Sequence, residues 1–585
     1  MKLERKKRQF VDENLVIDAW EVIKPYFEDL LSRDISQKSA FDKWLSDRSE
    51  LEAVLEEDAA WRYIRMTIDT RDEELSNAYS FFITKIQPEL APFDDLLNKK
   101  LAASPFFDPN TSVQEKRIFF RSVQTALELF REENIPLEAE LSELAQQYGS
   151  ISAAQTITYK GETLTMQKAS LFLKETDESV RQEVFEKICD RRRQDIEQLD
   201  KLYTELILKR QQLAQNAGFA NFRDYKFKSL GRFDYTKEDC FQFHKAIREH
   251  IVPLVKAIQQ EKLNKLGKAQ FKPWDLEVDP EGKSPLKPFE GGDQLLEGTL
   301  EMFKKLDPYF ADCLSTMKSM GHLDLDSKAG KSPGGYNYPL YEIGVPFIFM
   351  NSVGAQRDLV TMVHEGGHAV HSFLSRDLEL TAYKSVPSEV AELASMSMEL
   401  LTMPYWDEFY KNPEDLKRAK REQLESILKI LPWIAQIDEF QHWIYENPTH
   451  TVQERHQKWG ELAKSYGTGL TDWSGYEVML LTGWQRQLHL YEVPFYYIEY
   501  AIAQLGALGV WKNALQDQEK AIEQYKNALA LGYTRSIPEI YTSAGISFDF
   551  SEKHLQELAE FVKKHGALAF ASISAFVANT PCFNN

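Results

Sequence analysis

TMVHEGGHAVHSF, residues 361–373, is the stretch that decides the fold around it. His364 and His368 are four residues apart, so on an α-helix both imidazoles project from one face, about one turn from each other. Glu365 completes the pattern HExxH, in which the histidines bind zinc and the glutamate acts as a general base. The stretch therefore predicts a helix that supports hydrolysis by metal-activated water.

The alternative to a metal-binding helix is a helix with two solvated or core histidines. The composition and the neighbouring residues help to decide between the two. With 12 histidines in 585 residues, chance would give the pattern in roughly a few per cent of sequences of this composition. Gly366 and Gly367 each cost about 1 kcal/mol relative to alanine inside a helix, so we expect another element to pack closely there. The expected buried stripe of this helix consists of Leu359, Met362, Val363, Val370, Phe373 and Leu374.

The segment before the motif is rich in aromatic and β-branched residues. Residues 336–350, YNYPLYEIGVPFIFM, are interrupted by prolines and a glycine, which predicts one irregular edge strand beside the motif helix. Asn351 and Ser352 are expected to cap that helix. Residues 324–336, with Pro333, Gly334 and Gly335, predict either an ordinary hairpin turn or a backbone segment that binds an extended peptide by strand addition.

A hydrolytic zinc site needs a third protein ligand. His371 lies seven residues beyond His364, about 10 Å along a helix, which is too far for both to bind one ion. It is expected in the core or behind the ligands. Residues 386–401, VPSEVAELASMSMELL, predict a second, largely apolar helix that offers Glu389, Glu392 and Glu399, and spacing alone does not choose among them.

HEGGH followed by PSEVAELAS resembles the paired helices of the thimet oligopeptidase and oligoendopeptidase F family of zinc peptidases. The resemblance implies that His364, His368 and Glu392 bind one Zn²⁺ and that Glu365 is the base. It also implies a mainly α, elongated, two-lobed fold, with a small β-sheet beside the active-site helix and a deep substrate channel. Short unfolded peptides are the implied substrates, and either Glu389 or Glu399 is a candidate to orient a ligand histidine.

An aromatic segment follows much later, HLYEVPFYYIEY at residues 489–500. By itself it would be read as a core aromatic cluster. The resemblance implies that a His- and Tyr-rich segment donates hydrogen bonds to the oxyanion formed when water attacks the peptide carbonyl. The matching residues are His489, Tyr496, Tyr497 and Tyr500.

Composition excludes several classes of function. A formal charge of −20 without a basic stripe argues against a nucleic-acid partner. No run of 18 apolar residues predicts a membrane span, and the basic start MKLERKKRQF lacks the apolar run of a signal peptide. The four scattered cysteines, Cys189, Cys240, Cys313 and Cys582, form neither a CxxC site nor a disulfide framework, so we expect unreactive thiols in the cytoplasm.

The length predicts two lobes, an N-terminal helical lobe at residues 1–200 and a zinc peptidase lobe at residues 201–585. Residues 14–147 have a helical pattern, and residues 156–166 predict a hairpin that turns at Lys160 and Gly161. Residues 271–292 predict a long surface loop or connection. Further resemblance to the family lies in Val180 and Arg181, in residues 206–225, and in the pair Trp274 and Asp275. The boundary near residue 200 rests on this resemblance.

Two other functions stay open from the sequence. One is a helical zinc carboxypeptidase or dipeptidase, which would need a cation to hold the terminal carboxylate of its substrate. The other is a catalytically silent peptide-binding scaffold. The oligomeric state is not predicted.

Overall fold

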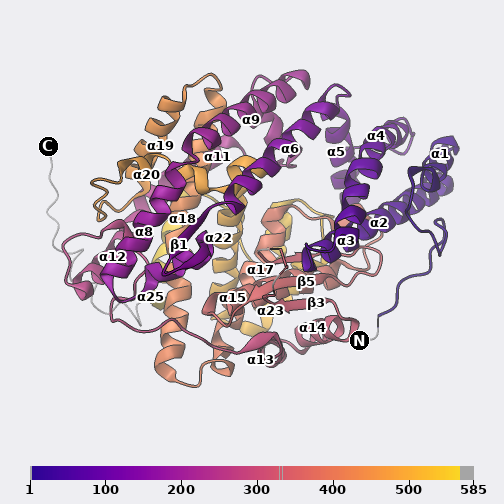
Figure 1. Cartoon of the computed structure of the whole chain (residues 1–585). Coiled ribbons are helices and arrows are strands. Elements are labelled where there is room, and N and C mark those ends of the chain that lie inside the picture. The colour runs from indigo at the N-terminus through magenta and orange to yellow at the C-terminus, as the bar shows by residue number, and fades with distance from the viewer. Residues whose placement is uncertain (1–2, 329, 333, 567–585) are drawn as a thin grey trace. The chain divides into compact units, whose positions relative to one another are not determined.

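The computed structural model describes residues 3–328, 330–332 and 334–566, and helices dominate it (Figure 1). Two small sheets contain all the strands among these residues, and one isolated parallel bridge joins Phe271 to Thr471. The mainly helical fold class with a small sheet beside the motif helix is therefore confirmed. No helix within the described ranges is long and apolar enough to cross a membrane. Pro333 and Cys582 lie outside the described residues.

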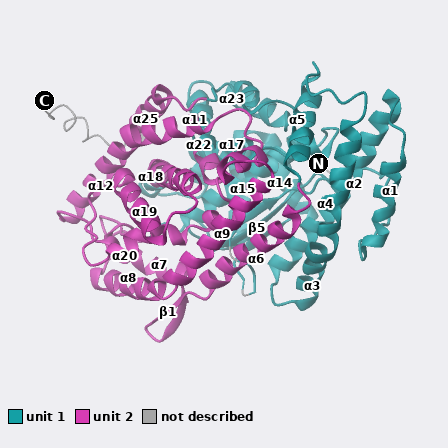
Figure 2. Cartoon of the chain, turned by 90° about the horizontal axis from the view of Figure 1, so that it is seen from above, with its two compact units in different colours: residues 1–130, 285–419, 502–548 teal, residues 131–284, 420–501, 549–585 magenta. Residues whose placement is uncertain are grey.

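The chain divides into two compact units, each made of segments that are distant in sequence (Figure 2). Unit 1 contains residues 1–130, 285–419 and 502–548, and unit 2 contains residues 131–284, 420–501 and 549–585. The division of the sequence into lobes at residue 200 stays a prediction.

Unit 1 begins with amphipathic helices, as the periodicity of residues 14–147 predicts. Their apolar faces form one core that includes Phe27, Trp44, Leu97 and Phe120. These helices are α1 (Lys24–Ser32), α2 (Lys38–Ile68), α3 (Glu73–Phe81), α4 (Gln87–Ala102) and α5 (Gln114–Leu129).

The rest of unit 1 surrounds a three-stranded sheet and the motif helix α15, which contacts α13, α14, α17, α23, β4 and β5. The strands are β3 (Leu323–Asp326), β4 (Tyr336–Tyr338) and β5 (Phe347–Ser352). The helices are α13 (Gly291–Leu306), α14 (Pro308–Met320), α15 (Gln356–Ser375), α16 (Thr381–Lys384), α17 (Ser388–Thr402), α23 (Gln518–Ala530), α24 (Ile537–Ser543) and most of α22 (Tyr497–Ala514).

The single edge strand predicted for residues 336–350 is wrong in two respects. Pro339, Gly344 and Pro346 break the segment into two strands, β4 and β5. The sheet order is β3-β5-β4, so β5 is central, parallel to β3 and antiparallel to β4. Of the two strands that this segment forms, β4 is the one at an edge. Four apolar residues in a row, Phe347 to Met350, suit a strand that is buried on both faces.

Unit 2 is helical apart from one hairpin. Its helices before residue 284 are α6 (Asn134–Ala153), α7 (Met166–Leu171), α8 (Glu178–Arg193), α9 (Ile196–Asn216), α10 (Phe222–Ser229), α11 (Lys237–Ala246) and α12 (Val252–Leu266). Those after residue 412 are most of α18 (Pro413–Glu446), with α19 (Val452–Tyr466), α20 (Glu477–Leu481), α21 (Leu488–Glu492) and α25 (Glu552–Gly566).

The predicted hairpin is confirmed as β1 (Thr156–Tyr159) paired antiparallel with β2 (Glu162–Thr165). Lys160 and Gly161 both have positive φ, 50° and 83°, which is the backbone that a two-residue hairpin turn requires.

The segment 271–292 is irregular, as predicted, but its first part is not on the surface. Trp274 and Asp275 lie in a buried 3-10 helix, η5 (Pro273–Asp275). Asp275 pairs with Arg181 of α8 at 2.8 Å and with Lys268 at 2.8 Å, and these charges hold the segment inside unit 2.

Candidate metal centre

Helix α15 presents the HEGGH motif, and its N-terminus is fixed by its own first turn. The Asp358 carboxylate accepts hydrogen bonds from the backbone amides of Val353 at 2.8 Å and Ala355 at 2.9 Å. The prediction that Asn351 and Ser352 cap this helix is wrong, because both belong to β5 and the helix begins at Gln356.

The two glycines of the motif are where α15 touches its neighbours. A Cβ on Gly367 would lie 2.6 Å from Ser395 Cα and 2.7 Å from the Ala394 oxygen, both in the backbone of α17. A Cβ on Gly366 would lie 2.6 Å from the ring of Phe303 on α13. The close packing predicted from these glycines is thus confirmed, and it brings the backbones of α15 and α17 together beside the histidines.

This approach brings two imidazoles and one carboxylate to the same place. Nε2 of His364 lies 3.3 Å from Oε2 of Glu392, and Nε2 of His368 lies 3.9 Å from the same oxygen. The two rings are 4.9 Å apart and nearly perpendicular. Of the three glutamates that the sequence left open, Glu392 is the one that forms a metal-ligand group with both histidines.

The donor set suits a zinc ion. Nitrogen and oxygen ligands at 2.0 to 2.1 Å from a tetrahedral ion are about 3.4 Å apart, close to the 3.3 and 3.9 Å observed. The side chains of His364 and His368 are 20% and 19% exposed, so solvent reaches one side of the group. Three protein ligands and an accessible fourth position are the arrangement of a catalytic zinc site, whereas structural sites are closed.

Opposite charges stabilise each other in this buried group. Burial lowers the pKa of His368 to about 4, which leaves its ring neutral with a lone pair for a metal. Burial acts against ionisation of His364 and Glu392 as well. Their hydrogen bonding to each other outweighs it, and so the pKa of His364 is raised and that of Glu392 is lowered.

Glu365 lies near this ligand group and is hydrogen-bonded to strand β4. Its side chain is hydrogen-bonded to the backbone of Asn337, and Nδ2 of Asn337 donates to the Glu365 carbonyl at 3.2 Å. The residue is only 7% exposed, and burial raises the pKa of its carboxyl to about 7. A carboxyl with a pKa near neutrality can both accept and return a proton.

The other candidates near the motif, Glu399, Glu389 and His371, lie outside the ligand group and have different surroundings. Oε1 of Glu399 lies 2.7 Å from Nδ1 of His364 and fixes which ring nitrogen faces the ligand group. Glu389 is buried at the start of α17 and is not part of the ligand group, so of the two orienting candidates the geometry favours Glu399. His371 is buried and hydrogen-bonded to the backbone of Leu529, as expected for a core histidine.

The aromatic segment gathers its four predicted residues within unit 2. The His489 ring lies 4.7 Å from that of Tyr497, 5.9 Å from Tyr500 and 6.2 Å from Tyr496. Gln487 lies 2.7 Å from Nδ1 of His489, and burial lowers the pKa of His489 to about 4. All four rings are half-buried, so they are not the closed core cluster that the segment alone would suggest.

Sequence reasoning missed two residues that hold the centre in place. Oγ of Ser395 lies 3.2 Å from Oε2 of Glu392, one turn further along α17, and the three-residue spacing was a usable signal. Asn337 reaches Glu365 from β4, and no local pattern indicates that pairing.

Comparisons with known proteins found family models, curated relatives and solved structures that match the chain. A model of peptidase family M3 matches residues 171–560, and a model of the peptidase M3 N-terminal domain matches residues 10–130. The chain is similar to a chromosomal oligoendopeptidase F of Lactococcus lactis subsp. cremoris, with 25% identity over 267 residues, which are 41% of this chain and 42% of that protein. It is also similar to the oligopeptidase PepF of Bacillus subtilis, with 26% identity over 262 residues, 43% of this chain and 38% of that protein. The matched stretches span less than half the length of these two curated relatives.

The likeness to a solved structure extends over nearly the whole chain. A structure of PZ peptidase A with an inhibitor superposes with a TM-score of 0.87 at 27% identity. It covers 96% of this chain and 99% of the other.

The contact at Gly367 can be tested by alanine substitution at two glycines, for which we expect opposite changes in stability. Gly367→Ala should lower the free energy of unfolding by about 1–3 kcal/mol and weaken metal binding, because the added methyl pushes the α17 backbone away. Gly149→Ala, in helix α6 with open space around it, should instead raise stability by up to about 1 kcal/mol. Urea denaturation and metal titration measure both variants, and a Gly367→Ala variant as stable as the parent would contradict the contact.

Proposed function

We propose, on the premise that the chain belongs to peptidase family M3, that it hydrolyses internal peptide bonds of short unfolded oligopeptides with the help of one zinc ion. Membership in this family confirms the resemblance noted in the zinc-motif helices. One observation carries the proposal: His364, His368 and Glu392 converge, and the Glu365 carboxyl lies beside them on the same helix.

His364, His368 and Glu392 would hold the zinc ion, and Glu399 would keep the His364 ring turned toward it. When bound there, zinc supplies Lewis-acid polarisation of a peptide carbonyl and makes water more acidic. Ser395 restrains the Glu392 carboxylate, so two residues of α17 preorganise the ligand set by hydrogen bonds.

Glu365 carries the protons in the proposed reaction. It accepts one from the attacking water and returns it to the nitrogen of the leaving amine. The contact with Asn337 holds Glu365 against β4. One carboxylate of the site thus binds the ion while another is left to exchange protons.

The peptide substrate would lie along β4. This strand is an edge of its sheet, paired only with β5 among the described strands, and the backbone of its Asn337 reaches Glu365. Gly334, with φ of 99°, and Gly335 lead into it, so a peptide backbone can approach closely. Pairing through the backbone does not depend on side chains, which suits an enzyme that accepts many peptides.

His489, Tyr496, Tyr497 and Tyr500 are proposed to donate hydrogen bonds to the oxyanion. Their grouping and their half-exposed rings support this role, and the family resemblance assigns it. The proposal places the enzyme in the cytoplasm, which suits the free buried thiols of Cys189, Cys240 and Cys313. No nucleic-acid or membrane partner is proposed.

Replacing the proposed base should separate metal binding from turnover. Glu365→Gln should leave one zinc ion bound and lower kcat by roughly 10²–10⁴-fold, because the amide cannot accept the proton of the attacking water. Zinc content by mass spectrometry and cleavage of a quenched peptide measure the two effects. Glu392→Ala should lose the zinc as well, whereas Glu379→Gln, at an exposed carboxylate of the same unit, should change neither. Retained activity in Glu365→Gln would remove the base assignment.

The position of cleavage tests the endopeptidase class. Peptides of graded length, acetylated at the N-terminus and amidated at the C-terminus, should be cut at internal bonds, and a chelator should abolish the cutting. Mass mapping of the products identifies the bonds. Cleavage only of peptides with a free terminus would instead favour the carboxypeptidase or dipeptidase, and metal binding without cleavage of any peptide would favour the silent scaffold.

The oxyanion assignment predicts a loss confined to the chemical step. His489→Ala and Tyr497→Phe should each lower kcat by roughly 10²–10³-fold with a small change in KM, because the lost donor acts only on charge that develops in the transition state. Tyr476→Phe, whose hydroxyl bonds to Glu186 elsewhere in unit 2, is the matched control and should keep kcat. An unchanged kcat in both His489→Ala and Tyr497→Phe would refute the role.

A further inference from the structure

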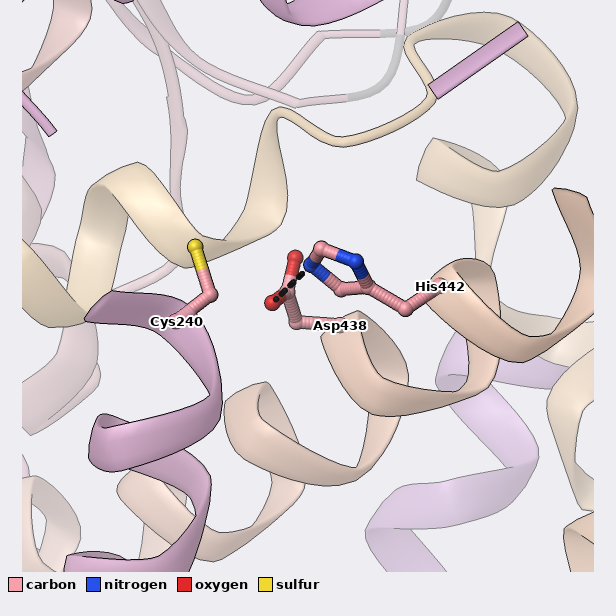
Figure 3. Close-up of side chains that lie close together, drawn as sticks. All are labelled: Cys240, Asp438 and His442. Carbon is pink, nitrogen blue, oxygen red and sulfur yellow. Dashed lines mark ion pairs between the residues drawn. The ribbon is translucent and has the colours of Figure 1, made fainter. Parts of the chain in front are cut away.

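A second cluster of metal-binding side chains lies in unit 2. Cys240 and His244 are four residues apart on α11, and Asp438 and His442 are four residues apart on α18. Each pair therefore projects from one face of its helix. Ligand atoms of Cys240, Asp438 and His442 all lie within 4.8 Å of one another, and Figure 3 shows the carboxylate of Asp438 between the thiol and the imidazole.

The protein satisfies the polar atoms of this cluster only in part. Nε2 of His442 pairs with Oδ2 of Asp438 at 3.3 Å, whereas Nδ1 of His442 and Oδ1 of Asp438 have no hydrogen-bond partner. The side chains of His442 and Asp438 are 2% and 0% exposed. A buried polar atom without a partner destabilises the fold, so an arrangement with two of them calls for a ligand.

Aromatic rings surround the His442 side of the cluster. The rings of Phe241, Phe495 and Phe227 lie 4.9, 5.4 and 5.7 Å from the His442 ring. Beyond the unsatisfied atoms of the cluster itself, such rings offer few hydrogen-bond partners to a water molecule.

We propose that Cys240, Asp438 and His442 bind a second divalent transition-metal ion, with a structural role, at the junction of α11 and α18. Thiolate, imidazole and carboxylate together are a zinc-type or cobalt-type donor set, whereas magnesium and calcium take oxygen ligands. The 3.3 Å between the His442 nitrogen and the Asp438 oxygen matches the separation of about 3.4 Å between neighbouring ligands of a tetrahedral ion.

Charge balance favours the same ion. Binding releases the thiol proton of Cys240 to solvent, and the thiolate and the Asp438 carboxylate then neutralise the two positive charges of the metal. A neutral complex avoids the cost of burying net charge among aromatic rings. His244 is a positioning residue here, because its Nε2 lies 2.8 Å from Oδ2 of Asp438 and orients that carboxylate.

The proposed second site differs from the peptidase centre because one of its ligands is a thiolate. Co²⁺ bound to a thiolate has a characteristic absorption band, so cobalt can distinguish the two sites. Purified full-length protein, stripped by a chelator and reloaded with Co²⁺, should hold about two ions per chain and show a sulfur-to-cobalt charge-transfer band in the near ultraviolet. The double variant with His364→Ala and His368→Ala should hold about one ion and keep the band. This arm leaves the second cluster intact and does not depend on whether the chain is a peptidase.

Cys240→Ser should lose the band and about one ion, while Cys189→Ser, at another buried thiol of unit 2, should keep both. Absence of the band in the parent protein and in the double variant would overturn the second site, even if Cys240→Ser failed to fold. Persistence of the band in folded Cys240→Ser would overturn it as well.

Discussion

The metal centre depends on how closely two helix backbones approach at Gly367. The space that a Cβ would occupy there is taken by Ser395 Cα and the Ala394 oxygen, so α15 and α17 meet backbone against backbone. Glu392 lies one turn before this contact on α17, and His364 and His368 lie on either side of it on α15. A side chain at this position would push apart the two elements whose donors must share one ion. The glycine that weakens the helix is therefore what makes a centre built from two helices possible.

Once the helices are in contact, the buried charges constrain one another. A carboxylate as enclosed as Glu392 is costly unless it is paired, and it lies within 3.3 and 3.9 Å of two imidazoles. Glu399 holds the other nitrogen of His364, and Ser395 holds the oxygen of Glu392 that faces the histidines. Glu365 is buried without such a cation partner and is held by β4 instead. Two carboxylates within one candidate centre thus have different environments, and the different chemical roles proposed for them rest on that difference.

The sequence predicted what depends on local spacing and missed what depends on tertiary contacts. The helix of His364 and His368, the close packing at Gly366 and Gly367 and the Lys160–Gly161 turn all follow from periodicity or backbone preference. Resemblance was needed to choose Glu392, because Glu389, Glu392 and Glu399 occupy one apolar helix and only the position of α17 distinguishes them. The capping prediction at Asn351 failed because β5 extends further than its apolar run, and the pairing of Asn337 with Glu365 joins two elements with no common pattern.

Pairs of metal-binding side chains four residues apart on a helix occur in both units, and the two groups that they form differ in how deeply they are buried. An i, i+4 pair on α15 and one acid on α17 form a group whose histidines are 20% and 19% exposed, so solvent and a substrate can reach it. The i, i+4 pairs on α11 and α18 meet where His442 and Asp438 are 2% and 0% exposed, so no substrate can reach this second group. Hydrolysis requires an open ligand position, whereas joining two helices requires a closed site. Cys240 suits the closed site, because a thiolate is protected from oxidation there and adds the negative charge that a buried ion needs. Exposure, more than ligand identity, therefore distinguishes the site proposed for catalysis from the site proposed for structure.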